Sequence, residues 1–407
     1  MDDIDIPSYF LCPISLEIMR DPVTVSSGMT YERESIERWI FSSKNSSCPV
    51  TRQPLSDADL TPNHTLRRLI QAWCTLNSSK GIERFPTPKP PIDQAQILKL
   101  LNDGKSQQHQ MNCLRNLKSI ANESERNRRC LESAGVIEFL ASIVNSTNLE
   151  DDEGASGRAI DEALNLLYHL QISEIGIKKL INRNSGEFIQ TLMRVLQDGT
   201  YQSRAYAVMI LKSMFELADP VYVMSLQVEQ FVEIVNVLRD QISQNASMAA
   251  LQLMVEICPW GRNKIKAVEA GAVSVLIEML IETTDQRRVC EMVLVVLDHL
   301  CRCAEGRAEL FRHGAGIAVV SKKILRVSDV ASERGVRILS SISKFSATSN
   351  VLQEMLQVGV VTKLCLVLQV DCSLKTKEKA KEMLRLHSRV WKNSSCIPVH
   401  LLSCYPS

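Results

Sequence analysis

The sequence lacks an excess of charge of either sign. Its 407 residues include 47 lysines and arginines against 46 aspartates and glutamates, which gives a formal net charge of +1 at pH 7. A protein that binds nucleic acid or a membrane surface through its bulk charge normally carries a clear basic excess. The composition therefore argues against both functions, and we expect no nucleic-acid partner.

Long hydrophobic runs are also missing. No apolar stretch approaches the roughly 18 residues needed to span a bilayer, so we expect no integral membrane segment. The first residues, Met1 to Asp5, are acidic and lack the basic and apolar regions of a secretion signal. The 13 cysteines are scattered without paired spacing, which favours a reducing compartment in which thiols act as small buried groups. The expected location is cytoplasmic, and the nucleus is left open.

The first 75 residues have the spacing of a two-zinc domain but too few metal ligands for one. Cys12-Pro13 and Cys48-Pro49 flank residues 31–40, whose pattern predicts an amphipathic helix. Two tetrahedral zinc ions need eight Cys or His ligands, and only Cys12, Cys48, Cys74 and His64 are present. We therefore expect no metal. Hydrogen bonds and salt bridges should hold the loops instead, with these candidates: Glu17, Arg20, Asp21, Glu32 and Arg38.

Three segments of this region resemble a U-box, the zinc-free relative of the RING domain in ubiquitin ligases. They are residues 12–23, 28–33 and 48–55, and residues 60–70 fit the end of the domain. The match runs over about 70 residues without a gap, which is specific for a motif. The resemblance implies a small α+β domain at residues 6–76.

A proline-rich stretch follows this domain. Prolines stand at 86, 88, 90 and 91, where they cannot continue a helix and favour extended backbone in the preceding residues. We expect residues 77–94 to form a stiff, exposed linker that keeps its two neighbours apart.

From residue 95 onward the sequence repeats itself. An apolar segment at helical spacing recurs, and its fifth position falls at 117, 167, 211, 254, 297, 339 and 384. A period of about 43 residues lies in the armadillo/HEAT range. A second signature, glycine followed by apolar residues, recurs at Gly135, Gly271, Gly314 and Gly359 and allows a sharp turn between helices. The pattern predicts an α-solenoid of about seven armadillo repeats at residues 95–391, followed by a tail at 392–407 that covers the last repeat.

Two features of the repeats bear on their binding partners. An acidic segment at 148–157 is inserted in the second repeat, and we interpret it as a tolerated surface insertion rather than a docking loop. Armadillo import receptors grip extended peptides with a ladder of asparagines on the third helix of each repeat. The equivalent positions in this chain contain one asparagine, so we expect the ligands to be folded surfaces or helices: Asn116, Leu166, Ile210, Leu253, Val296, Ile338 and Met383.

The U-box resemblance assigns roles to five residues. Ile14 and Leu16 in the first loop, Trp39 in the helix and Pro49 in the second loop match positions that dock the conjugating enzyme. Arg52 matches the cation that bridges ubiquitin and that enzyme, a role that suits the fixed fork of a guanidinium. Taken alone, Trp39 would be interpreted as a core residue and Arg52 as a solvated one. The two flanking loops favour the functional interpretation.

With its repeats, the chain resembles a plant U-box armadillo-repeat E3 ubiquitin ligase. The U-box would dock a ubiquitin-charged conjugating enzyme and promote transfer to substrate lysines, and the repeats would select the substrate. The resemblance implies no cofactor, no covalent ubiquitin–ligase intermediate, and a role in plant defence and stress signalling. A homo-oligomer is left open. The alternatives are a non-catalytic armadillo scaffold or adaptor, against which the set of Ile14, Trp39, Pro49 and Arg52 argues, and a transport receptor.

Overall fold

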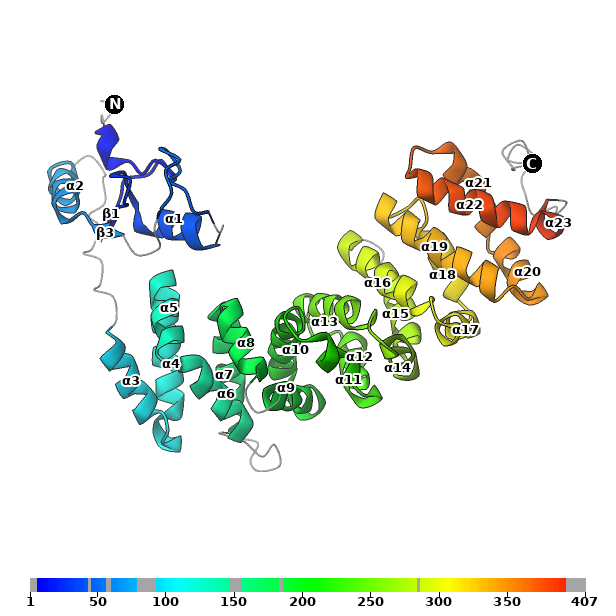
Figure 1. Ribbon diagram of the computed structural model, residues 1–407, viewed down its shortest axis with the longest axis horizontal. Helices are drawn as coiled ribbons and strands as arrows, with labels where there is room; N and C mark the ends of the chain where they lie inside the picture. Colours follow the sequence, from blue (N-terminus) through cyan, green and yellow to red (C-terminus); the bar gives the residue numbers. More distant parts are fainter. Residues whose placement is uncertain are drawn as a thin grey trace. The chain divides into compact units, whose positions relative to one another are not determined.

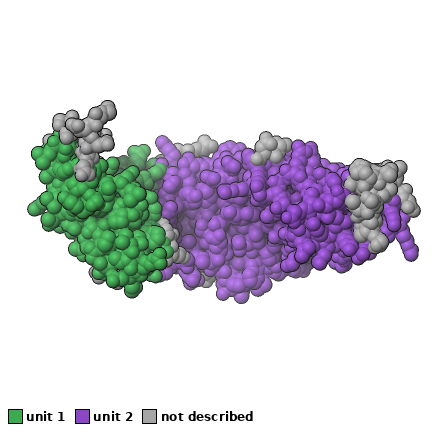
Figure 2. Space-filling view, turned by 90° about the horizontal axis from the view of Figure 1, so that it is seen from above, with its two compact units in different colours: residues 1–136 green, residues 137–407 purple. Residues whose placement is uncertain are grey.

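The chain, seen here as a computed structural model, forms two compact units, Met1–Val136 and Ile137–Ser407 (Figure 2). The residues that the structure describes are 6–42, 45–55, 60–78, 93–146, 156–182, 186–283 and 286–392. Most of the predicted linker, most of the acidic insertion at 148–157 and the tail after Lys392 lie outside the described residues.

The first unit begins with a small α+β domain, residues 6–78, which we call the N-terminal domain. Its sheet has the order β2-β1-β3, and both pairings are antiparallel. Val23 of β1 lies opposite Tyr31 of β2, and both side chains are fully buried. The elements of this domain are η1 (Ser8–Phe10), β1 (Pro22–Thr24), β2 (Thr30–Glu32), α1 (Arg33–Glu37), η2 (Arg38–Ser42), β3 (Thr61–Pro62) and α2 (His64–Leu76).

The helix predicted over residues 31–40 begins later than its pattern indicates. Tyr31 belongs to β2, where the burial of successive side chains alternates as it does in a strand, and α1 begins at Arg33. A π-helical turn, η2, continues α1 to Ser42. Ile36 and Ile40, four residues apart, are both buried, so the apolar spacing identified the helix itself correctly.

Helices form the rest of both units, which confirms the predicted fold class: mostly α, with a small α+β domain before an α-solenoid (Figure 1). Seven long helices contain the recurring apolar segment. They are α4 (Gln107–Glu123), α7 (Ser156–His169), α10 (Tyr201–Phe215), α13 (Gln244–Ile257), α16 (Arg287–Leu300), α19 (Asp329–Phe345) and α22 (Leu374–Leu386).

Shorter helices connect and cover these seven. In the first unit they are α3 (Gln94–Asp103) and α5 (Glu125–Ser133), and α6 (Val136–Ser146) begins at the boundary of the units. In the second unit they are α8 (Glu174–Asn182), α9 (Glu187–Asp198), α11 (Pro220–Ser225), α12 (Val228–Asp240), α14 (Asn263–Glu269), α15 (Ala272–Glu282), α17 (Ala304–Arg312), α18 (Gly316–Lys323), α20 (Ser349–Gln357), α21 (Val360–Gln369) and α23 (Ser388–Trp391).

Six of the long helices lie side by side in the second unit. In chain order, α7, α10, α13, α16, α19 and α22 each contact the next, and we call this set the ladder (Figure 1). Most positions of their apolar segments are buried, because each helix packs against its neighbours in the ladder, and all but α7 also contact a shorter helix. One continuous core therefore runs through the repeats of the second unit, as expected for a solenoid.

In the second unit, the residues predicted to stand at the peptide-gripping asparagine positions of import receptors are the wrong ones. Leu166, Ile210, Leu253, Val296, Ile338 and Met383 are all buried, so these side chains pack in the core and cannot grip a peptide. In five of the six helices the residue one position earlier is partly or fully exposed, and in α7 that residue, Asn165, is also buried. These six residues also include one asparagine: Asn165, Met209, Gln252, Val295, Arg337 and Glu382.

The glycine signature is confirmed at three of its four positions. Gly135, Gly271 and Gly359 have φ values of +86°, +81° and +76°, the left-handed region that glycine adopts without steric cost. Gly314 differs, since it is absent from the positive-φ residues of the described chain. In that repeat Gly316, at the start of α18, is the restricted glycine, because an added Cβ would lie 2.0 Å from the carbonyl oxygen of Leu310.

Polar side chains also tie successive repeats together. Asn263 is fully buried and donates through Nδ2 to the carbonyl oxygens of Val223 and Ile257, both at 2.9 Å. Lys323 donates to the carbonyl oxygen of Thr283 at 2.7 Å, and the Trp391 indole donates to that of Leu352 at 3.1 Å. Trp391 of α23 is fully buried and covers the last repeat, a role that the sequence assigned to the tail beyond it.

Within the described ranges, no single helix is both long and apolar enough to cross a membrane. The pair α20 and α21 meets the length and composition criteria only when taken together, and it bends by 63° at the break between the two helices.

Candidate functional site

Two loops of the N-terminal domain share one backbone pattern. In the first loop, the Cys12 N–H donates to the Glu17 carbonyl at 2.9 Å, and the Leu16 N–H donates to the Cys12 carbonyl at 2.8 Å. In the second, Cys48 donates to Gln53 at 2.8 Å, and Arg52 donates to Cys48 at 2.9 Å. Each position in the second loop lies 36 residues after its counterpart in the first. The two loops are therefore the same turn built twice.

The bases of the loops are also equivalent. Leu11 pairs with Ile18 through an antiparallel bridge, and Ser47 pairs with Pro54 in the same way. Just outside these bridges, Met19 donates to the Phe10 carbonyl at 2.9 Å, and Leu55 donates to the Ser46 carbonyl at 2.8 Å. Each loop is thus a closed hairpin whose tip is fixed by its own backbone.

The fifth residue of each loop has a left-handed backbone. Leu16 has a φ of +59° and Arg52 a φ of +58°. This conformation is costly for a side chain with a Cβ, and it persists only where the surrounding hydrogen bonds impose it. Both residues are exposed, with Leu16 at 75%. The turn therefore presents an apolar side chain from one loop and a guanidinium from the other.

The Cys48 thiol joins the second loop to the sheet. Its sulfur lies 2.9 Å from the Tyr31 hydroxyl and accepts from the Ser27 hydroxyl at 3.2 Å and from the Thr51 N–H at 3.5 Å. Burial opposes ionisation of this thiol, but the hydrogen bonds from Ser27, Thr51 and Tyr31 outweigh it and lower the pKa of Cys48 to about 6. Burial, together with the bond to Cys48, raises the pKa of Tyr31, so the phenol keeps its proton and can donate it.

The Cys12 thiol has the corresponding role in the first loop. It accepts from the Ile14 N–H at 3.5 Å and from the Glu32 N–H at 3.3 Å. Glu32 and Tyr31 are adjacent in β2, so this one strand holds the first loop through Cys12 and the second through Cys48. The two thiols thus stand where metal ligands would be expected and bind protein donors.

Charged groups close the remaining gaps around the sheet. The Glu32 carboxylate accepts from the backbone N–H of Arg20 at 2.6 Å and from that of Asp21 at 3.1 Å, and burial raises the pKa of Glu32. The Asp21 carboxylate lies 2.5 Å from Arg33 and 3.9 Å from Arg67. Glu32 and Asp21 were among the sequence candidates, and Arg20, a third candidate, takes part here through its backbone N–H, whereas Arg33 and Arg67 were missed.

The other two candidates contribute differently. Glu17 takes part through its backbone carbonyl, which closes the first loop. Arg38 pairs with Glu34 at 2.7 Å on the exposed side of the helix. An exposed pair of this kind contributes little to stability. Among the described residues there is no group of three or more Cys, His, Asp or Glu side chains that could hold a metal ion.

Trp39 connects the helix to the second loop. Its indole Nε1 donates to the carbonyl oxygen of Ser47 at 2.9 Å, and its ring is partly buried against the domain core. Ile14 is likewise partly buried against the same core, and Pro49 is partly exposed beside Cys48. Trp39 therefore contributes to the core and keeps part of its surface accessible, and its docking role stays a prediction.

One exposed apolar residue of these loops was missed. Val50 is 52% exposed and occupies in the second loop the place that Ile14 occupies in the first. The repeated order of Cys-Pro followed by a β-branched residue was visible in the sequence and could have identified it.

Arg52 has a side chain with no hydrogen bond or ion pair to any residue in the described parts of the chain, so its fork is available to a ligand.

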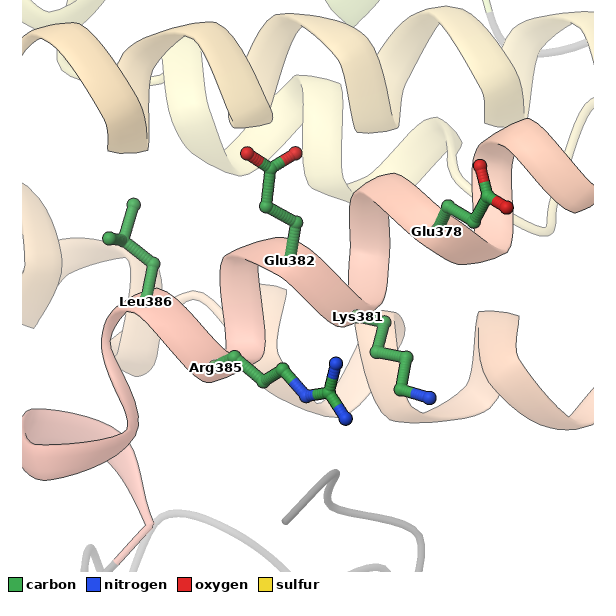
Figure 3. Close-up of a pocket in the computed structure, with 5 residues that line it drawn as sticks. All are labelled: Glu378, Lys381, Glu382, Arg385 and Leu386. Carbon is green, nitrogen blue, oxygen red and sulfur yellow. The ribbon is translucent and has the colours of Figure 1, made fainter.

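A hollow lies at the end of the ladder, on α22. It is shallow and open, with a volume of about 620 Å³, and its walls carry charge of both signs. Figure 3 shows Glu378, Glu382 and Leu386 on one side of the helix and Lys381 and Arg385 on the other. Glu382 lies 3.3 Å from Lys344 of α19, so part of this charge is already paired within the ladder.

Comparison with known proteins relates the N-terminal domain and the helical repeats to one family of proteins. A family model described as "U-box domain" matches residues 6–79, and one described as "Plant U-box protein ARM repeat region" matches residues 95–407. The chain is 56% identical over 409 residues to the E3 ubiquitin-protein ligase PUB23 of Arabidopsis thaliana, covering 100% of this chain and 98% of the relative. For PUB22 of the same plant, the identity is 54%, covering 100% and 99%, and for PUB24 it is 38%, covering 99% and 96%.

Proposed function

Because this chain belongs to the plant U-box E3 ubiquitin-protein ligases with an ARM repeat region, we propose that its U-box docks a ubiquitin-charged conjugating enzyme through the two matched loops. The ligase activity, of the RING/U-box type, follows from the family. The docking surface, the substrate and the cellular role are the proposal.

The observation that supports this proposal is that hydrogen bonds hold the first loop, the second loop and Trp39 together. β2 holds both loops through the thiols of Cys12 and Cys48, and Trp39 is bonded to the base of the second loop. Ile14 and Leu16 therefore stand in a fixed relation to Trp39, Pro49 and Val50. A small interface gains affinity when its apolar anchors are already ordered, because binding then costs less conformational entropy.

The reaction itself needs no nucleophile from this chain. The conjugating enzyme carries ubiquitin as a thioester, and the attacking group is a lysine amine of the substrate. What the U-box supplies is orientation, which converts a loosely held thioester into one poised for attack. Arg52 can donate two hydrogen bonds at once from an exposed position, which suits a bridge between ubiquitin and the enzyme.

The solenoid is the part that we propose selects the substrate. The ladder presents six helices in a row with partly exposed side chains, a surface large enough for a folded or helical partner. A catalytic ligase rather than a passive scaffold or adaptor is favoured by the complete set of Ile14, Trp39, Pro49 and Arg52. We leave the oligomeric state out of the proposal.

The docking surface can be tested by calorimetric titration with an uncharged ubiquitin-conjugating enzyme. Ile14→Ala and Val50→Ala should each weaken binding by on the order of 1–3 kcal/mol, as expected at apolar anchors. Leu69→Ala is the matched control, because Leu69 is 52% exposed on α2 and lies outside both loops. Binding unchanged by both loop variants, with circular dichroism confirming their fold, would reject this surface.

The cellular role is also proposed, in plant defence and stress signalling within the cytoplasm. The family resemblance supports the role, and the cysteines of the described ranges, all free thiols, support a reducing compartment. A fluorescent fusion expressed in plant cells would test the location. Plants that lack the gene should respond differently from wild type to a microbial elicitor. An unaltered response together with an exclusively nuclear fusion would reject both parts.

A further inference from the structure

Three arginines gather around one buried aspartate on two neighbouring helices of the ladder. Asp298 of α16 is 5% exposed. Its Oδ2 lies 2.9 Å from Arg334 Nη1, 3.2 Å from Arg337 Nη2 and 3.5 Å from Arg302 Nη2. Arg302 follows α16, whereas Arg334 and Arg337 come from α19 (Figure 1). We call Arg302, Arg334 and Arg337 the arginine site.

The positive charge of the arginine site exceeds the negative charge that surrounds it. Three guanidinium groups surround a single buried carboxylate, and an arginine side chain stays protonated in proteins. Glu333 lies 3.8 Å from Arg337, but it is 39% exposed, so water screens its effect. Burial and then the nearby Arg302 lower the pKa of His299, beside Asp298, so that this imidazole adds no charge at neutral pH. An excess of between one and two positive charges remains.

Most of the donors in the site are also unused. Each guanidinium has five N–H groups. Within the described ranges, Arg302 and Arg334 each use one nitrogen on Asp298, and Arg337 uses Nε and Nη2 on Asp298 and Nη1 on Glu333. The side chains are 45%, 25% and 30% exposed for Arg302, Arg334 and Arg337. Their remaining N–H groups can therefore reach a ligand.

A purely structural role accounts for only part of this arrangement. One arginine would suffice to pair Asp298 and link α16 to α19. The two helices are already joined by apolar packing and by the Ser341 hydroxyl, which donates to the Cys301 carbonyl at 2.8 Å. Bringing three like charges together costs free energy unless an anion offsets their repulsion. Asp298 offsets part of it and fixes the guanidinium groups in place.

We propose that the arginine site binds the phosphoryl group of a phosphorylated residue in a partner protein. A phosphomonoester carries about −1.5 to −2 charges at pH 7 and three strong acceptor oxygens, which matches the excess charge and the free donors. A single carboxylate supplies less charge and two oxygens. One guanidinium can donate two parallel hydrogen bonds to the oxygens of a phosphate, and three guanidinium groups can surround one phosphoryl group. The inference rests on the proposed role of the solenoid in substrate selection.

The test is direct binding to the full-length protein, followed by fluorescence anisotropy. The probes are three pools of labelled nine-residue peptides with randomised flanks, which carry phosphoserine, serine or glutamate at the central position. The phosphoserine pool should bind at least tenfold more tightly than the other two. Arg334→Gln should abolish this preference, since it removes one cation and leaves Asp298 paired with Arg302 and Arg337.

The matched control is Arg312→Gln. Arg312 is exposed on α17, outside the ladder, and pairs with Glu309, so its loss removes the same charge without touching the site. The phosphoserine preference should survive in this variant. Equal binding of the phosphoserine and glutamate pools, or equal loss in both variants, would overturn the proposal. Thermal unfolding checks that Arg334→Gln is folded. Discharge of a charged conjugating enzyme reports separately on the U-box, so failure of the proposed docking would appear there, and failure of the solenoid to bind any of the three pools would count against substrate selection.

Discussion

Cys12 and Cys48 occupy equivalent places in their loops, and each thiol accepts hydrogen bonds from groups distant in sequence. A sulfur atom in this position performs locally what a metal ligand would do, because it anchors a loop to the strand beside it. The arrangement depends on the donors keeping their protons. Tyr31 is therefore as much a part of it as Cys48.

Replacing Cys48 tests this dependence. Cys48→Ala leaves the buried Tyr31 hydroxyl without the sulfur that accepts its proton, which should lower the stability of the N-terminal domain by on the order of 1–3 kcal/mol. The pH dependence should change as well. Since the pKa of Cys48 is lowered from 9.0 to about 6 in the folded chain, the stabilisation from ionisation is complete above pH 9 and is lost as the pH falls to about 6.

Urea unfolding between pH 6 and 9, followed by tryptophan fluorescence, measures both effects. The wild-type protein should gain stability as the pH rises through this window, and Cys48→Ala should show a flatter curve. Cys74→Ala is the control, because burial raises the pKa of Cys74 rather than lowering it. Parallel curves for the wild type and Cys48→Ala would show that the thiol stays neutral.

Arg52 should act on the rate of transfer and not on docking. Arg52→Ala removes a guanidinium that is exposed and has no partner in the described chain, so the affinity for the uncharged conjugating enzyme should barely change. Discharge of the thioester should slow by about 10- to 100-fold, the equivalent of a charge-assisted hydrogen bond of about 1.5–3 kcal/mol. An interaction made only in the reactive state alters rate without altering ground-state binding.

Calorimetry with the uncharged enzyme and single-turnover kinetics separate these effects. Arg68→Ala on α2 is the control for loss of an exposed charge in the same domain. If Arg52→Ala weakened docking as much as Ile14→Ala and left discharge normal, Arg52 would be an interface residue.

At the scale of elements, apolar spacing was a reliable guide to the helices and a poor one to their ends. Ile36 and Ile40 marked α1 correctly, but the start of the helix was wrong, since Tyr31 faces inward from a strand as readily as from a helix. The positions that the sequence analysis compared with the asparagines of import receptors were wrong for a related reason. A helix that is packed on three sides has apolar residues around most of its circumference. The sequence pattern alone therefore does not show which of two adjacent residues is exposed.

The sequence could suggest the parts of the candidate site that depend on local order, but not those that depend on long-range contacts. The motifs predicted docking and bridging roles for Ile14, Leu16, Trp39, Pro49 and Arg52, and these roles stay predictions. The bonds of Tyr31 to Cys48 and of Arg33 to Asp21 join residues far apart in the chain, and nothing in their neighbourhoods indicates them. The arginine site was missed for the same reason, since Asp298 and Arg334 belong to different repeats.

Two glycines at helix starts, Gly271 before α15 and Gly306 in the first turn of α17, separate backbone strain from steric crowding. Gly271 has a φ of +81°, but no atom lies within 4 Å of an added Cβ, so Gly271→Ala should cost only the left-handed conformation, about 1–2 kcal/mol. At Gly306 an added Cβ would lie 2.1 Å from the carbonyl oxygen of Leu300, which is backbone and cannot rotate away. Gly306→Ala should therefore destabilise the solenoid more.

Thermal unfolding of both variants, compared with the wild type, tests this order. Gly157→Ala serves as the reference, since its added Cβ would meet no atom within 4 Å and its φ carries no left-handed cost. Should Gly271→Ala prove the more damaging change, the turn would be restricted by contacts that the structure does not contain.

We propose that recruitment of the conjugating enzyme and selection of the substrate belong to different parts of the chain. The N-terminal domain has its own core, built from residues such as Phe10, Val23, Tyr31 and Ile70. A fragment of residues 1–80 should therefore still assemble ubiquitin chains with a conjugating enzyme. A fragment of residues 91–407 should bind substrate and assemble none. Gel assays and pull-downs measure these outcomes, and a solenoid fragment active on its own would refute the division.

We propose that the U-box accelerates transfer by docking and orientation, without metal and without carrying ubiquitin itself. The most direct measurement is single-turnover discharge of a ubiquitin-charged conjugating enzyme onto free lysine, with the full-length protein dialysed against a strong chelator. We expect rapid discharge by the wild type, little acceleration by Ile14→Ala, and no reducible ubiquitin adduct on the ligase. Loss of activity on chelation, or an adduct that disappears on substitution of one cysteine, would contradict it.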